Sequence, residues 1–412
     1  YERGLFMKKI KIKPITYIYF LFSIGIAVQI FSLILFGGNF LEKIVYDFSY
    51  FVDFFDHVRR FYLGLDNVYA EGMHACFPPL AYCMYYLISR ILYKDNINKP
   101  ETINTSGSGM LLICMLTAIF IMFFIFAFFR LYHGKSIASK KWMAALFVCS
   151  YPFWLAIERG NMSLLVLILL MYAMALKDST KIWERETALL LFAMAAALKL
   201  YPAVFGLLYL ISKRYKEAVR LVIYGVLFFF LPFVFFQGVH GFQIFLHNIN
   251  AVGSGATGVT IVGICGRLGL KLGMSLERGH AVGRIISYLY FGFVIVYSCH
   301  RKDTWRSVMF LTSLMIIFVA ASGTYCLIYC VIPFICYMNE LKEVRAYTKV
   351  HYVYATLFVL IFAAYPIEML GSSGALYIAL YLFIAVLLFE AAVHGIRRVS
   401  FGFISRKDVS GA

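Results

Sequence analysis

Three titratable side chains lie close together in the segment Asp53-Phe54-Phe55-Asp56-His57. The two carboxylates are three residues apart, so they share one face if the segment is helical. A carboxylate beside a membrane surface can accept a proton from an incoming hydroxyl group. A second carboxylate can hold the acceptor or raise the pKa of the first. His57 could orient or share the proton, and the segment therefore has the residues of a general base.

The same segment has a second interpretation. An amphipathic helix lying on the membrane would place aromatic side chains of this region in the bilayer, namely Phe54, Phe55, Phe61 and Tyr62. Composition alone does not separate the two interpretations.

A polar group, Glu158-Arg159-Gly160-Asn161, separates two apolar runs of about 16 residues. Arg159 is permanently charged, and its planar guanidinium suits a phosphate group. Asn161 could bond the phosphate or a sugar. The alternative is a simple turn with an interfacial arginine.

A lysine interrupts a later apolar run at Lys199-Leu200-Tyr201-Pro202. Proline lacks a backbone N–H and disfavours a helical conformation in the residue before it. We expect two short helices that meet at this break, with Lys199 facing a cavity. A charge within a membrane segment usually marks a functional path; the alternative is a lysine that snorkels or forms a structural pair.

Two tyrosines, Tyr325 and Tyr329, begin a late apolar run at helical spacing. They could line the same cavity or form a packed aromatic face. The nine cysteines show no CxxC pair and no Cys/His metal spacing. We therefore predict buried, unpaired cysteines and no metal site.

Composition places these residues in a membrane protein. Of 412 residues, 62% are hydrophobic and 14% charged, and the mean hydropathy is +0.81. Runs of about 18 or more apolar residues, each able to cross about 30 Å of hydrocarbon, recur along the chain. We predict an all-α polytopic membrane protein with spans at 14–37, 77–93, 109–131, 142–158, 162–177, 186–211, 221–238, 282–299, 306–321, 323–338, 351–369 and 374–394.

The net charge of +17 is concentrated in short segments between and beside the spans. This pattern is typical of cytosolic loops, so we place the N-terminus in the cytosol and exclude nucleic acid as a partner. The basic loops at 133–141, 178–185 and 212–220 should all be cytosolic. If 77–93 crossed the membrane fully, the loop at 133–141 would lie on the opposite face. Either 77–93 is a short, partly inserted helix, or the charge rule fails once.

The expected organisation follows from these spans. A basic N-terminus covers 1–13, of which residues 1–6 precede Met7 and are expected to be a vector or start-site remnant. A catalytic module covers 14–237 and includes a first extra-cytosolic loop at 38–76. A glycine-rich, mobile extra-cytosolic loop then covers 238–281, C-terminal spans cover 282–395, and a basic cytosolic tail covers 396–412.

The order of these motifs resembles glycosyltransferase family 87, the polyprenyl-phosphate-mannose-dependent α-mannosyltransferases of bacteria. The acidic loop is followed by Gly64, Val68-Tyr69 and Phe77-Pro78-Pro79-Leu80, then by Glu158-Arg159-Gly160-Asn161 and Lys199-Leu200-Tyr201-Pro202. The resemblance covers roughly residues 45–237. More distantly, the chain resembles the catalytic subunit of GPI mannosyltransferase I.

The resemblance implies a GT-C fold with about 11–13 transmembrane helices, in the cytoplasmic membrane of a bacterium, with the active site facing outside. It implies a donor in which a hexose, most often mannose, is linked to polyprenyl phosphate, and a glycolipid or glycan acceptor. No cofactor or metal is expected. The expected partners are the substrates and the membrane lipids, and we expect the protein to be a monomer.

The family's base is an Asp followed by Phe-x-x-Tyr, so Asp53 inherits the role, with His57 in the place of the tyrosine. The spacing to Tyr69 is about two residues shorter than the family's, which keeps Asp56 as the alternative. Donor binding falls to Arg159, Asn161, Lys199 and Tyr201. Tyr69, His74, Tyr325 and Tyr329 are the residues expected to contact the acceptor or line the cavity. A transporter or flippase of a lipid-linked sugar is the alternative function, because it would share the spans and the intramembrane lysine.

Overall fold

The computed structural model describes residues 12–44, 51–70, 75–92, 107–254, 259–301, 304–318, 322–363 and 376–393. Within these ranges the chain folds into helices joined by short turns. Five helices are long and apolar enough to cross a membrane: Pro14–Leu35, Leu111–Leu131, Tyr215–Phe235, Leu276–Cys299 and Leu376–Val393. The prediction of an all-α polytopic membrane protein is therefore confirmed.

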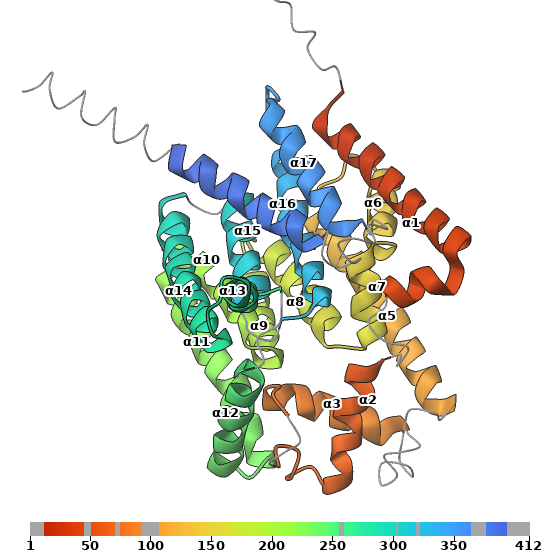
Figure 1. Cartoon of the computed structure of the whole chain (residues 1–412). Coiled ribbons are helices and arrows are strands. Elements are labelled where there is room, and N and C mark those ends of the chain that lie inside the picture. The colour runs from red at the N-terminus through yellow and green to blue at the C-terminus, as the bar shows by residue number, and fades with distance from the viewer. Residues whose placement is uncertain are drawn as a thin grey trace, which may run out of the picture.

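Sixteen labelled helices and one further helix, Leu376–Val393, make up the described fold (Figure 1). In chain order the labelled helices are α1 (Pro14–Ile44), α2 (Val52–Arg59), α3 (Pro79–Leu92), α5 (Gly107–Leu131), α6 (Ile137–Val148), α7 (Tyr151–Arg159), α8 (Ser163–Leu176), α9 (Ile182–Leu198), α10 (Leu207–Ile211), α11 (Tyr215–Phe230), α12 (Val239–Ser254), α13 (Ile261–Lys271), α14 (Leu276–Arg301), α15 (Trp305–Ser313), α16 (Val331–Glu340) and α17 (Lys349–Phe362). Shorter turns of helix connect several of them.

The long helices keep large apolar side chains on the outside of the protein. Ile34 on α1 is 74% exposed, Phe126 on α5 is 54% exposed, and Val222 on α11 is 63% exposed. Exposed apolar side chains that recur along helices in this way are unusual on proteins that face water. These faces are therefore suited to contact with lipid.

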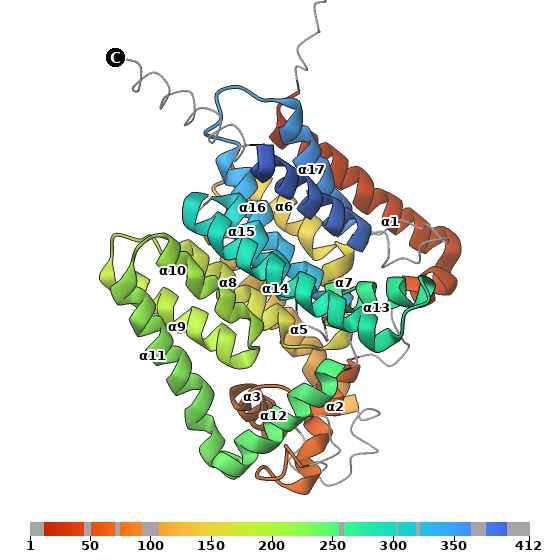
Figure 2. The ribbon, with the colours of Figure 1, turned by 60° about the vertical axis from the view of Figure 1, so that its left-hand side comes forward.

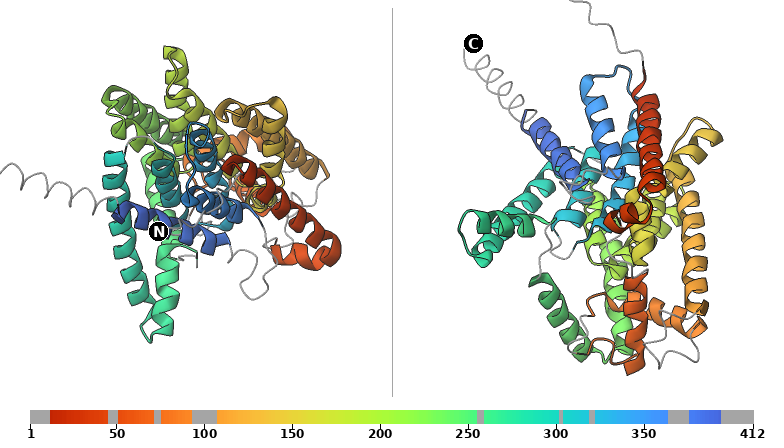
Figure 3. Two further views of the ribbon diagram at one scale, coloured as in Figure 1. Left: turned by 90° about the horizontal axis from the view of Figure 1, so that it is seen from above. Right: turned by 45° about the vertical axis from the view of Figure 1, so that its right-hand side comes forward.

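Most of the helices lie in the middle of the molecule, between a lower and an upper end (Figure 1). In Figure 1, α2, α3 and α12 lie together at the lower end, and α17 rises at the upper end. The N-terminal helix α1 runs beside α17 (Figure 3), and the Tyr17 hydroxyl lies 3.0 Å from the Thr356 hydroxyl. The candidate catalytic segment on α2 thus belongs to the lower end.

The run that we expected at 142–158 is two helices, so this span prediction is wrong. The helix α6 ends at Val148, and α7 begins at Tyr151 after a turn at Cys149 and Ser150. Pro152 near the start of α7 explains the break, because proline fits the first turn of a helix and not its interior. The helix α7 ends at Arg159, and the next residue, Gly160, provides a left-handed C-terminal cap with φ of 62°.

The expected mobile loop at 238–281 is also wrong. Apart from residues 255–258, which lie outside the described ranges, this segment is mostly helical and forms α12, α13 and the start of α14. Its glycines allow α13 and α14 to pack side by side (Figure 2). A Cβ on Gly279 would lie 2.8 Å from the Cα of Gly266, and one on Gly283 would lie 2.6 Å from the Cα of Val262. Small residues here serve close helix contact, not mobility.

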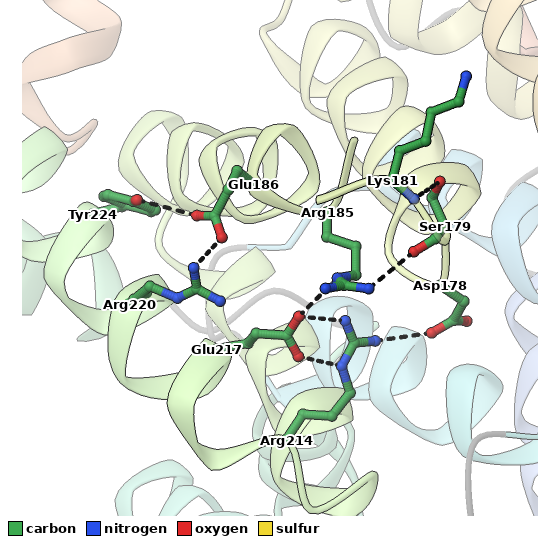
Figure 4. Close-up of polar contacts among 9 residues, drawn as sticks. All are labelled: Asp178, Ser179, Lys181, Arg185, Glu186, Arg214, Glu217, Arg220 and Tyr224. Atoms are coloured by element: carbon green, nitrogen blue, oxygen red, sulfur yellow. Dashed lines mark hydrogen bonds and ion pairs between the residues drawn. The ribbon is translucent and has the colours of Figure 1, made fainter. Parts of the chain in front are cut away.

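Ion pairs hold the start of α9 against the start of α11 (Figure 4). Arg214 joins Asp178 at 2.9 Å and Glu217 at 2.7 Å, and Arg185 lies 3.4 Å from the same Glu217 carboxylate. Further along the two helices, Arg220 pairs with Glu186, whose other oxygen accepts from Tyr224 at 3.2 Å. This network lies on the basic segment 212–220 and fixes one end of the α9–α11 pair.

Candidate functional site

The segment before α2 is fastened to the end of α7. The Phe51 N–H donates to the carbonyl oxygen of Glu158 at 2.6 Å, and Phe51 itself has a left-handed backbone with φ of 57°. Behind this contact the side chains of Phe54, Phe55 and Phe61 are buried in protein. They therefore do not dip into lipid, and that interpretation is wrong for these three residues; the Tyr62 side chain lies outside the described part.

Gly160 makes the contact between α2 and α7 possible. A Cβ at this position would lie 2.8 Å from the Cβ of Phe54, and the backbone is left-handed. We expect Gly160→Ala to lower the free energy of unfolding by about 1–3 kcal/mol, because both strain and overlap oppose it. The measurement is thermal unfolding in detergent. Gly292→Ala on α14 is the control, since a Cβ there meets nothing within 4 Å; equal melting temperatures for the two variants would contradict the prediction.

Both oxygens of the Asp53 carboxylate accept hydrogen bonds from the end of α7 and the turn that follows it. Arg159 Nη2 donates to Oδ1 at 2.5 Å, and Asn161 Nδ2 donates to Oδ2 at 2.8 Å. The Asp53 side chain is 16% exposed and the Arg159 side chain 22% exposed. Two motifs more than 100 residues apart in the sequence thus meet at one carboxylate.

A line of hydrogen bonds continues from this carboxylate to the buried lysine. The Ser163 hydroxyl donates to Asn161 Oδ1 at 2.8 Å, and the Ser163 N–H donates to the same oxygen at 3.0 Å. Lys199 Nζ in turn donates to the Ser163 hydroxyl at 2.8 Å. Ser163 was not among the predicted site residues; its one signal in the sequence is its place two residues after Asn161.

Lys199 lies at the predicted break between α9 and the 3₁₀ turn Tyr201–Gly206, and its side chain is only 4% exposed. Three rings surround its ammonium group: Nζ is 5.2 Å from the centre of Phe77, 5.5 Å from Tyr201 and 5.0 Å from Tyr325. Such rings stabilise a desolvated cation. No carboxylate of the described residues pairs with this ammonium, so the structure leaves it able to bind an anion.

The two late tyrosines also reach this site. The hydroxyl of Tyr329 lies 3.0 Å from the hydroxyl of Tyr201, and Tyr325 forms one wall around Lys199. Both tyrosines come from the 3₁₀ turn Thr324–Cys330. Both tyrosines therefore pack beside Lys199 and Tyr201, and the interpretation that they line a cavity stays a prediction.

Asp56 shares the helix of Asp53 but has different partners. It pairs with Arg59 and, at 2.8 Å, with Arg60. Burial raises the pKa of the Asp56 carboxyl, but the charge of Arg60 and the hydrogen bonds from both arginines outweigh burial and hold the pKa below its ordinary value. The geometry thus gives Asp56 a local pairing, whereas Asp53 meets the residues predicted to bind the donor.

His57 is buried among aromatic rings. Its Nδ1 lies 3.3 Å from the Tyr82 hydroxyl, and its ring centre is 4.3 Å from that of Phe77. Tyr69 is buried nearby, with its hydroxyl donating to the carbonyl oxygen of Phe77 at 2.7 Å. Both residues therefore contact Phe77, which is one of the three residues whose rings surround the Lys199 ammonium group. His74, the other residue expected here, lies outside the described residues.

The environment of His57 predicts a pH-dependent stability. Burial, with a further contribution from the charge of Arg60, lowers the pKa of His57 to about 4. The native protein thus holds the ring neutral, while the unfolded chain takes up a proton near pH 6.5. This contribution to the free energy of unfolding is complete above about pH 6.5 and is lost as the pH falls toward 4. Between pH 7.5 and 4.5 the melting temperature should fall more steeply with falling pH for the wild type than for His57→Phe. Equal slopes of melting temperature against pH would contradict the prediction.

Comparison with known proteins adds one finding to this geometry. The model of glycosyltransferase family 87 matches residues 99–323, more than half of the 412-residue chain. The match includes Arg159, Asn161 and Lys199, whereas Asp53 precedes it. Searches of curated proteins and of solved structures each find no match. On the family match, this multi-pass membrane protein belongs to glycosyltransferase family 87.

Proposed function

We propose that this glycosyltransferase moves a hexose, with mannose as the first choice, from a polyprenyl-phosphate carrier to a hydroxyl group of a lipid or glycan. Asp53 is the general base in this proposal, and the reaction takes place on the extra-cytosolic side. Membership of a glycosyltransferase family favours an enzyme over the transporter or flippase that the sequence left open.

The observation that carries the proposal is that the polar site at Lys199 and an apolar groove adjoin at the Lys199–Pro202 break. The ammonium group of Lys199 connects through Ser163 and Asn161 to Asp53. Leu200 and Pro202, one and three residues after Lys199 in the chain, line the groove. A ligand with a phosphate head and a hydrocarbon tail would match this arrangement, with the phosphate at the polar site and the tail in the apolar groove.

The groove has a volume of about 680 Å³ and lies between α9, the Tyr201–Gly206 turn and α11. Small residues form much of its wall, namely Ala193, Ala196, Ala197, Ala203, Gly206 and Gly225. Its lining includes Tyr215 at one end of α11 and Phe230 at the other, a length of about 24 Å for this 16-residue helix. A polyprenyl chain could therefore lie along it within the hydrocarbon.

The proposed step uses the residues as they stand. Asp53 takes the proton of the acceptor hydroxyl, whose oxygen attacks the anomeric carbon of the sugar. The bond from that carbon to the phosphate oxygen breaks, and the carrier phosphate keeps the electron pair. Arg159 and Lys199 neutralise the charge that develops on the phosphate. Arg159 has five N–H donors, so it can hold Asp53 and a phosphate together.

Turnover in liposomes tests the proposal. Purified protein would receive radiolabelled polyprenyl-phosphate-mannose and a crude lipid acceptor, and we expect labelled product together with free carrier phosphate. Parallel arms with polyprenyl-phosphate-glucose and polyprenyl-phosphate-galactose identify the sugar.

A further arm with nucleotide sugars is the control for the donor. Transfer from a nucleotide sugar, with none from any polyprenyl-phosphate hexose, would contradict the proposed donor. Carrier phosphate that appears only when acceptor is present distinguishes transfer from movement of an intact lipid across the membrane.

A further inference from the structure

A second cavity, of about 490 Å³, lies between the 66–70 segment and α12. Both elements belong to the same end of the molecule as α2 (Figures 1 and 2). Polar side chains dominate its rim, namely Asp66, Asn67, Gln237, His240, Gln243 and His247. None of these residues takes part in the hydrogen-bonded line from Asp53 to Lys199.

The chemistry of this rim narrows the class of ligand. Three amides, two imidazoles and one carboxylate offer both donors and acceptors on planar groups. The described lining contains no lysine or arginine, so a phosphate head would lack a permanently charged partner there. A ligand ring that carries several hydroxyl groups suits such a rim, because each hydroxyl group can both donate and accept a hydrogen bond. The cavity therefore has the chemistry of a sugar site.

The walls of the cavity are fixed before any ligand binds. Asn248, only 3% exposed, donates from Nδ2 to the carbonyl oxygens of Ala75 at 3.0 Å and Tyr69 at 3.4 Å. At the rim, Gln237 Nε2 donates to Asn67 Oδ1 at 2.9 Å. These bonds connect α12, and Gln237 two residues before it, to Asn67, Tyr69 and Ala75 in the part of the chain that precedes α3. Fixed walls reduce the entropy lost on binding.

Gln237 provides a second, independent observation. Its backbone is left-handed, with φ of 60°, and the next residue, Gly238, has φ of 58°. The turn is tight, because a Cβ on Gly241 would lie 1.7 Å from the carbonyl oxygen of Phe236. A side chain at a left-handed position costs of order 1 kcal/mol relative to glycine, and such strain is concentrated at functional sites. The chain thus keeps a glutamine side chain at the rim where glycine would be unstrained.

We propose that this cavity binds a sugar unit of an oligosaccharide acceptor, away from the hydroxyl group that receives the new sugar. The inference rests on the proposed function and names the acceptor as a glycan of at least two units. The catalytic site and the cavity share a wall, since Tyr69 lines the cavity and bonds to Phe77, and Phe77 faces Lys199. The two sites are therefore neighbours, with Tyr69 and Phe77 between them, and a glycan of two or more units is the acceptor that could reach both.

Two variants test the inference. The double variant Gln243→Ala/His247→Ala removes two rim side chains from exposed positions of α12. Gln237→Gly removes a third rim side chain and relieves the left-handed backbone, but it also removes the bond to Asn67, so its melting temperature in detergent is measured beside its kinetics. Asn250→Ala, on an exposed position of α12 that does not line the cavity, is the matched control.

The kinetic measurement is transfer to acceptors of one, two, three and four sugar units. We expect the KM for the longer acceptors to rise about tenfold in both test variants, as the loss of one or two hydrogen bonds implies. The value of kcat, the KM for the one-unit acceptor and the behaviour of Asn250→Ala should not change. An unchanged KM for every acceptor would overturn the inference.

Direct binding separates this inference from the proposed function. Manno-, gluco- and galacto-oligosaccharides of two to four units would be titrated against wild type and both variants, with ligand-observed NMR as the readout. Binding that weakens in the variants, without transfer from any polyprenyl-phosphate hexose, would support the cavity and reject the donor. Failure of the wild type to bind any of the oligosaccharides would reject the cavity itself.

Discussion

Asp53→Asn is expected to lower kcat by about 10²–10⁴-fold while the protein stays folded, because a neutral amide cannot take the proton of the acceptor. The substitution keeps the shape of the side chain, and Arg159 can still donate to the amide oxygen. Turnover of polyprenyl-phosphate-mannose in liposomes gives the rate, and the melting temperature in detergent reports the fold.

Asp56→Asn is the matched control, since it removes the same charge from the same helix. Asp56 contacts Arg59 and Arg60 and not the Arg159–Asn161 motif. We expect its kcat to stay within a few-fold of wild type. An inactive Asp56→Asn beside an active Asp53→Asn would reverse the assignment of the base.

Lys199→Met is expected to lower kcat by about 10²–10³-fold, the usual cost of removing one preorganised group that stabilises charge in the transition state. Methionine is unbranched and only one atom shorter than lysine, so it can fill the space between Phe77, Tyr201 and Tyr325 that the ammonium group occupies. Replacing a buried charge by an apolar group of similar shape is often neutral or stabilising. The melting temperature should therefore not fall with the activity.

Lys177→Met is the control for this prediction, because Lys177 is also buried and pairs with Asp178 in the loop between α8 and α9, away from the site. Its kcat should remain within a few-fold of wild type. Full activity in Lys199→Met would favour the interpretation of Lys199 as a structural or snorkelling lysine.

The sequence predicted those features of the site that depend on local chemistry. Pro202 predicted the break beside Lys199, and the structure confirms it. Helical spacing placed Asp53 and Asp56 on one face, but it could not show which carboxylate meets Arg159. That choice depends on the bond between Phe51 and the Glu158 carbonyl, across more than 100 residues of sequence.

Glycine was the residue type that sequence reasoning interpreted wrongly. A glycine-rich segment is compatible with a mobile loop and with two closely packed helices, and the difference depends on the partner. The pair Gly279 and Gly283, four residues apart on α14, was the available signal, because small residues at this spacing favour close helix contact. The cavity beside α12 could not be predicted either, since it forms only when that helix packs against the 66–70 segment.

The hydrogen bonds that join Lys199 to Asp53 all run in one direction. Lys199 donates to Ser163, Ser163 to Asn161, and Asn161 to Asp53. An ammonium group can only donate and a carboxylate can only accept, so the line has no reversed form, and its aligned dipoles strengthen one another. Once Asp53 carries a proton, its oxygen accepts less strongly and each bond back to Lys199 weakens in turn. The lysine thereby becomes freer to donate elsewhere, and the site can pass this change over three bonds without moving a helix.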